Sequence, residues 1–180
     1  MTCRLHLTGA SGAGTTTLGR AVAGALSVPH ADADDYFWVP TSPAYVEQRE
    51  PADRLRLMNE IFVPRPAWVL SGSMLGWGDE IVERCDGVVF LTLDPEVRLA
   101  RLEARQLLRR GGAPIDDATS VFLAWARGYD DPGFDGRSRV RHEEWLDDLD
   151  RPVLRLDSAL PVDVLCAAVV DWAAGLQGRA

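Results

Sequence analysis

The chain has 180 residues, a hydrophobic fraction of 47% and a formal net charge of −8 at pH 7. This length suits one domain with a full core, so we expect residues 1–180 to form a single domain. The negative charge argues against nucleic acid and anionic membrane surfaces as partners. No segment has the length and apolar character of a membrane span, and the N-terminus lacks a signal-peptide pattern.

The cysteine and histidine residues show no metal-binding spacing. Cys3, Cys85 and Cys166 are widely separated, which predicts reduced thiols and a cytoplasmic location. The histidines are also scattered, and we interpret each as a core or surface residue. For the oligomeric state, a monomer and a homodimer both stay open.

The first predicted elements are a strand over residues 4–8 and a helix over 15–26, joined by a glycine-rich turn. The turn matches the phosphate-loop pattern G-x4-G-K-[ST] at Gly9, Gly14 and Thr16. Its glycines let successive N–H groups surround an anion at the start of a helix. We predict that ATP or GTP binds here with Mg²⁺, and that Thr16 is a metal ligand. The predicted nucleotide-binding residues of the loop are Gly9, Ala10, Ser11, Gly12, Ala13, Gly14, Thr15, Thr16 and Thr17.

The loop departs from the pattern at Thr15, which stands where a lysine normally reaches the phosphates. The chain contains no lysine, and all 19 basic residues are arginine. A compositional bias of the genome would produce this too, but a required lysine normally survives such bias. We therefore interpret Thr15 as a chemical difference. An arginine from elsewhere in the chain would supply the charge, because arginine binds phosphate oxygens bidentately.

An acidic segment follows the second predicted strand, which covers residues 28–32. If that strand continues, Asp32 and Asp34 point to one face and Asp35 to the other. The segment is either part of a site or a solvated polar turn. The aromatic residues of 36–38, and Trp77 further along, either line an acceptor pocket or pack in the core.

The rest of the chain alternates helices and strands. Pro51 begins a predicted helix over 51–62, and Asp94 and Pro95 begin a long one that ends near residue 110. This alternation predicts an α/β fold with a five-stranded parallel sheet and helices on both faces. The other predicted elements are strands over 67–70, 87–93 and 152–157, and helices over 116–127, 138–149 and from 161 onward.

Arginines gather on the long helix. Arg98, Arg101, Arg105 and Arg109 recur every three or four residues and so share one face. Such a stripe either neutralises a phosphoryl group or forms a solvated, salt-bridged surface. We expect the opposite, apolar face to pack on the sheet, through Val97, Ala100, Ala104, Leu107 and Leu108. Arg110 adds to this stripe, and Arg137, Arg139 and Arg141 follow the glycine-containing stretch 131–136.

These features together resemble the adenylate kinase and shikimate kinase group of small P-loop kinases. The resemblance implies a three-layer P-loop NTPase fold, an acceptor-binding region over about 36–66 and a lid over about 109–139. It also implies that Asp32 holds the metal and that Asp157 and Ser158 lie beside the nucleotide base. The residues to which it assigns catalytic roles are Asp32, Asp34, Arg101, Arg105, Arg109, Arg137 and Arg139.

The chain departs from this group at the end of the third strand. Ser71 stands where these kinases commonly have the aspartate of an Asp-Gly pair, and Met74 to Gly76 replace the arginine of adenylate kinases. This weakens the case for a nucleoside monophosphate as the acceptor. We therefore predict an ATP-dependent phosphotransferase that acts on a nucleotide, a nucleoside or another small hydroxyl-bearing metabolite. A simple P-loop NTPase and a nucleotide-binding sensor with little turnover are the alternatives.

Overall fold

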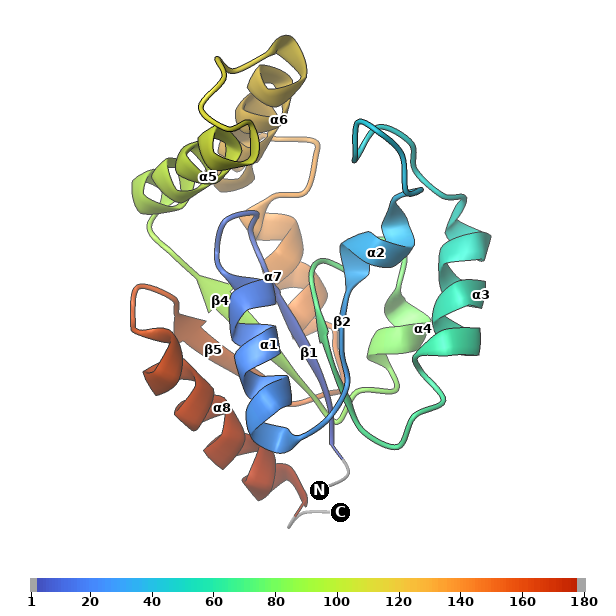
Figure 1. Cartoon of the computed structure of the whole chain (residues 1–180). Coiled ribbons are helices and arrows are strands. Elements are labelled where there is room, and N and C mark those ends of the chain that lie inside the picture. Colours follow the sequence, from blue (N-terminus) through green and yellow to red (C-terminus); the bar gives the residue numbers. More distant parts are fainter. Residues whose placement is uncertain (1–2, 178–180) are drawn as a thin grey trace.

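Five parallel strands form the central sheet of the computed structural model, which describes residues 3–177 (Figure 1). β1 lies in the middle, where Leu5 is opposite both Val69 of β3 and Gly87 of β4. The strand order is β2-β3-β1-β4-β5. The strands are β1 (Arg4–Gly9), β2 (His30–Asp32), β3 (Trp68–Ser71), β4 (Gly87–Thr92) and β5 (Val153–Asp157).

Helices cover both faces of this sheet. α1 (Thr15–Leu26) and α8 (Val162–Gln177) pack on one face, where Leu18 and Val169 meet Leu7 in a fully buried cluster. α3 (Pro51–Ile61), α4 (Asp79–Val82) and α7 (Arg139–Asp147) pack on the other face, through residues such as Met58 and Leu146. The predicted α/β fold with a five-stranded parallel sheet and helices on both faces is confirmed.

Two further helices stand above the carboxyl ends of the strands (Figure 1). α5 (Pro95–Arg109) packs on α6 (Asp117–Arg127), and the 3-10 turn η1 (Gly128–Asp130) leads on to α7. The expected apolar face of α5 against the sheet is wrong: Leu108 is 82% exposed, and the buried residues of α5 are Arg98 and Leu102. The face of α5 that carries Arg98 and Leu102 lies against α6 and the phosphate loop, because α5 extends beyond the edge of the sheet.

Most boundaries lie close to their predicted places, and the differences have local causes. β2 begins at His30 rather than at 28, because Val28 donates its N–H to Ala23 O and so closes the end of α1. The short helices α2 (Ala33–Phe37) and α4 were not predicted. Within residues 3–177 no helix is both long enough and apolar enough to cross a bilayer.

Candidate functional site

The glycine-rich loop between β1 and α1 has the backbone of an anion-binding turn. Gly12 and Gly14 adopt φ angles of 88° and 90°, which strain any residue with a side chain. A Cβ atom on Gly9 would lie 2.6 Å from the carbonyl oxygen of Leu91, so only glycine fits where the loop leaves the sheet. α1 begins directly after Gly14, and its positive end points at the loop. The nine predicted loop residues therefore run without a break from the last residue of β1, through the turn of residues 10–14, into the first turn of α1.

A carboxylate at the end of β2 is tied to this loop by hydrogen bonds. Thr16 Oγ1 donates to Asp32 Oδ2 at 2.6 Å, and Ser71 Oγ donates to the same oxygen at 3.2 Å. Because the Ser71 hydroxyl gives its proton to Asp32, His30 Nε2 is the donor in its 2.9 Å contact with the Ser71 oxygen. α1, β2 and β3 thus meet at one carboxylate group.

His30 is a member of this cluster that the sequence analysis missed. Its place two residues before Asp32 on one strand puts both side chains on the same face, which was a usable signal. Gly19 of α1 makes room for the cluster, since a Cβ atom there would lie 2.9 Å from His30 Nε2 and 3.1 Å from Ser71 Cβ.

The oxygens around Asp32 fit a magnesium ion. A carboxylate and two hydroxyl groups converge there, and Mg²⁺ prefers such oxygen ligands. Among residues 3–177, no three or more His, Cys, Asp and Glu side chains form a metal-binding group. Mg²⁺ typically keeps several waters and binds one or two carboxylates together with substrate phosphates.

Asp34 lies next to Asp32 but not as the strand pattern predicted. β2 ends at Asp32, whose Oδ1 accepts from Asp34 N at 3.1 Å and so caps α2. The strand does not continue beyond Asp32, so the condition under which Asp32 and Asp34 would share a strand face is not met. The side chain of Asp34 stays accessible to solvent, while desolvation in the crowded cleft, and then the Asp32 charge, raise its pKa. Arg137 and Arg105 act in the opposite direction, so both arginines lie near this carboxylate.

Arg98 is a structural part of the site. It is 1% exposed, and its guanidinium donates to Ser11 O at 3.0 Å, to Ala126 O at 2.9 Å and to Asp130 Oδ2 at 2.7 Å. Arg98 therefore joins the loop, α6 and η1, and it is not part of a solvated arginine surface.

The other arginines of α5 point to different parts of the cleft. Both Nη atoms of Arg101 donate to Ser158 O at 3.3 Å, next to Asp157, the last residue of β5. Arg105 faces Asp32 and Asp34, and desolvation together with the charge of Arg109 lowers its pKa. The stripe therefore extends from the β5–α8 loop to the acidic segment.

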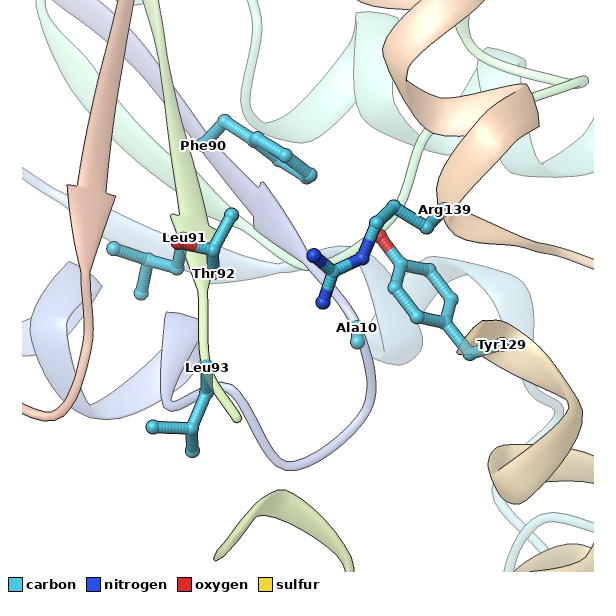
Figure 2. A pocket seen from close by; sticks show the side chains of 7 residues that line it. All are labelled: Ala10, Phe90, Leu91, Thr92, Leu93, Tyr129 and Arg139. Carbon is cyan, nitrogen blue, oxygen red and sulfur yellow. The ribbon is translucent and has the colours of Figure 1, made fainter. Parts of the chain in front are cut away.

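Two arginines next to the start of α7 reach towards the loop from the other side. Arg137 Nη2 donates to Ser11 Oγ at 2.7 Å. Arg139 Nη2 donates to Asp130 Oδ1 at 3.0 Å, and its side chain points into a narrow hollow that Ala10, Thr92 and Tyr129 also line (Figure 2). Arg139 is thus paired, whereas Arg137 contacts the loop itself.

Aromatic side chains and two arginines shape the region beyond α2. Arg54 is buried, with its guanidinium carbon 3.7 Å from the Phe37 ring centroid and 5.6 Å from that of Trp77. Arg49 Nη1 donates to Asp35 O at 3.0 Å and to Tyr36 O at 3.1 Å. The cluster lies at the carboxyl ends of β2 and β3, beside Asp32.

Two histidines, His6 and His142, lie in the core. This is one of the two roles, core or surface, that the sequence analysis left open for each histidine. His142 Nε2 lies 3.2 Å from Thr8 Oγ1, and its Nδ1 lies 3.0 Å from the Tyr129 hydroxyl. His6 contacts Leu70 O at 3.3 Å through Nδ1, while its Nε2 is buried without a partner in the described part of the chain. Burial is the main cause that lowers their pKa values, to about 4 for His6 and about 3 for His142.

Comparisons with known proteins identify relatives of this chain. No protein-family model matches the chain. The uncharacterised protein YqaC of Bacillus subtilis is 36% identical over 173 residues, which span 93% of this chain and 96% of that protein. Shikimate kinase 2 of Syntrophotalea carbinolica is 32% identical over 142 residues, which span 69% of this chain and 80% of that enzyme.

Solved structures of small-molecule kinases share the fold. Shikimate kinase from Acinetobacter baumannii, in complex with shikimate, superposes with a TM-score of 0.60 at 18% identity, over 99% of this chain and 96% of that one. A gluconokinase from Sinorhizobium meliloti superposes with a TM-score of 0.56 at 17% identity, over 99% of this chain and 98% of that one.

Proposed function

Because the chain belongs to the P-loop small-molecule kinases, we propose that it transfers the γ-phosphoryl group of ATP to a small hydroxyl-bearing metabolite. One observation carries the proposal: the Thr16 hydroxyl of the loop binds Asp32 Oδ2 at 2.6 Å. That contact supports a metal site beside the proposed phosphate site. Such an arrangement is what phosphoryl transfer needs, because this reaction is catalysed chiefly by position and charge.

The nucleotide would bind along the loop. In this proposal the amides of Gly12 to Thr16 hold the phosphates at the start of α1. The base would lie near Asp157 and Ser158, where Arg101 now donates to the Ser158 carbonyl. ATP is our first choice, and GTP remains a candidate.

Magnesium would bind Thr16 and Asp32, with Ser71 orienting the Asp32 carboxylate through its hydrogen bond. When bound, the ion would neutralise part of the charge of the phosphates. His30 forms a hydrogen bond with Ser71, so we assign it the role of holding Ser71, and through it the Asp32 carboxylate, in place.

Asp34 is the residue that we assign to the acceptor. Its raised pKa, near Asp32, suits a general base better than an ordinary surface aspartate. The acceptor oxygen forms a bond to the γ-phosphorus while the bond from phosphorus to the bridging oxygen of ADP breaks. The acceptor hydroxyl proton passes to Asp34, and ADP leaves with the electron pair of the broken bond.

The acceptor would bind over about residues 36–66, and a lid over about 109–139 would close above it. The Phe37 and Trp77 rings and the buried Arg54 supply apolar surface and a cation there. Shikimate, gluconate and related polyols are therefore sensible first acceptors, alongside nucleosides and nucleotides.

We propose a cytoplasmic location, because the free thiols Cys3, Cys85 and Cys166 fit a reducing compartment.

A thermal-shift screen of polyols, hydroxy acids, nucleosides and nucleotides, each with Mg²⁺ and ATP, would find the acceptor. Turnover is then measured as ADP release with and without it. Acceptor-dependent ADP release supports the kinase. ADP release that no acceptor changes would indicate an NTPase, and tight ATP binding with no ADP would indicate the sensor.

A further inference from the structure

The phosphate loop lacks its own cation, yet a terminal phosphate gathers negative charge that something must offset. Thr15 occupies the lysine position, and a hydroxyl there contributes one neutral hydrogen bond. We propose that Arg137 takes the place of the missing lysine and binds the terminal phosphate of the nucleotide. This inference rests on the proposed nucleotide site and deepens it.

Arg137 reaches the loop directly. Its Nη2 atom donates to Ser11 Oγ at 2.7 Å, and its guanidinium carbon lies 5.2 Å from the ring centroid of Trp125. The next residue, Ser138, is 1% exposed and caps α7, so the backbone that carries Arg137 is well fixed. The cation is therefore held over the loop and not on a free surface.

The guanidinium of Arg137 has few hydrogen-bond acceptors around it. Within residues 3–177 it forms no ion pair with Asp or Glu, and its Nε atom is buried without a hydrogen-bond partner. Burial, assisted by the charge of Arg98, lowers its pKa, while Tyr129 and Asp34 act in the opposite direction. A half-buried cation without an ion-pair partner is costly, and an anion in the loop would remove that cost. Ser11 Oγ would then give way to a phosphate oxygen as the acceptor from Nη2.

The neighbouring arginines have other partners. Arg98 and Arg139 both pair with Asp130. Arg101 donates to Ser158 O, and the guanidinium of Arg109 lies 5.6 Å from the ring centroid of Tyr45. Arg105 faces the acidic segment. Among these arginines, Arg137 contacts the loop and, within the described residues, forms no ion pair with a carboxylate.

Calorimetry of ATP and ADP binding, with Mg²⁺, tests the inference without any acceptor. We expect Arg137→Ala to weaken ATP binding about 10- to 100-fold, as loss of a charge-assisted contact does, and to weaken ADP binding less than about 3-fold. Arg127→Ala is the matched control, because the Arg127 side chain is 66% exposed and its guanidinium lies 3.7 Å from Glu103. Should Arg137→Ala unfold, Arg137→Gln keeps a donor for Ser11 and carries the same expectation.

A rescue variant separates this role from a structural one. In the Arg137→Ala background, Thr15→Lys restores the usual loop lysine and should recover at least about 10-fold of the lost ATP affinity, whereas in the parent it should add less. Equal losses for ATP and ADP, unchanged ATP binding, or no rescue would each overturn the inference. A parent chain that binds no nucleotide would instead refute the proposed function itself.

Discussion

Arg98 donates a hydrogen bond of 3.0 Å to the carbonyl oxygen of Ser11, which fastens α5 to the phosphate loop. The contact is close, because a Cβ atom on Gly12 would lie 2.8 Å from Leu102 Cγ and 2.9 Å from Arg98 O. The arginine also binds Asp130 and the end of α6. The base of the proposed lid and the loop therefore form one packed unit.

Arg98→Met should destabilise the protein strongly. The substitution removes three hydrogen bonds of a buried group and leaves Asp130 with Arg139 as its partner. We expect the free energy of unfolding to fall by on the order of 3 kcal/mol, measured by urea denaturation. Arg127→Met removes an exposed arginine from the same region and should change it by less than about 0.5 kcal/mol. Equal, small effects would show that Arg98 is not a structural link.

Gly14→Val should abolish binding of ATP at the loop. Gly14 has a φ of 90°, which would strain the backbone of a valine there. A Cβ atom at this position would have no other atom within 4 Å, so the valine side chain would occupy open space beside the loop. We expect calorimetry to detect no ATP binding while circular dichroism still reports a folded chain. Undiminished affinity would remove the phosphate-loop interpretation. Gly24→Val, on a helix position that is also open, controls for the loss of a glycine.

Asp34→Asn should stop phosphoryl transfer and leave ATP affinity within about a few-fold, because the proposed function assigns this carboxylate to the acceptor and not to the nucleotide. In the parent, kcat/KM should fall as the pH drops through the raised pKa of Asp34, since the base must be ionised. The acid limb of the profile should therefore lie above the ordinary aspartate range. Asp35→Asn, at an exposed neighbour, serves as the control. Normal turnover by Asp34→Asn would show that the acidic segment is only a polar turn.

The core histidines should make the protein sensitive to acid. The pKa values of His6 and His142 are lowered, to about 4 and about 3, from an unfolded value near 6.5. The unfolded chain therefore binds protons first, and stability falls as the pH drops from about 6.5 towards these values. His6→Leu removes one of these groups, whose Nε2 has no partner within residues 3–177. Urea midpoints between pH 7 and pH 4.5 should decline less steeply for this variant; an identical decline would contradict the assignment.

Gly19→Ala should weaken the proposed metal site from behind. The new methyl group would lie 2.9 Å from His30 Nε2 and 3.1 Å from Ser71 Cβ, so the chain that supports Asp32 must shift. We expect a lower apparent affinity for Mg²⁺, by about 10-fold, in ATP-dependent assays, which is the lower end of the range typical for residues that support metal ligands. Gly24→Ala, on the same helix with no neighbour within 4 Å, should leave this affinity unchanged.

Sequence periodicity predicted the sheet and the loop well, because both depend on local signals. The helix over 15–26 and the start of the helix at Pro95 match the structure, since glycine, Asp94 and proline mark these ends. The sequence also indicated Thr16 and Asp32, which do meet. Spacing after a phosphate loop is a strong signal, because the fold brings the carboxyl ends of β1 and β2 to one edge of the sheet.

Partners between distant segments were beyond the sequence. The pairs Arg98–Ser11, Arg137–Ser11 and Thr8–His142 join residues more than 80 positions apart, and no periodic pattern encodes them. The same reason explains the wrong apolar face of α5. A helix that projects past the sheet buries the side that meets α6 and the loop, and this depends on the path of residues 110–138 rather than on the helix itself.

The contact between the Arg137 guanidinium and the Trp125 indole affects the intrinsic fluorescence of the protein. Trp125 is 38% exposed, and its indole is the one whose ring centroid lies 5.2 Å from the guanidinium carbon of Arg137. The emission of an indole depends on charges close to its ring. Displacing that cation should therefore change the intrinsic fluorescence of Trp125.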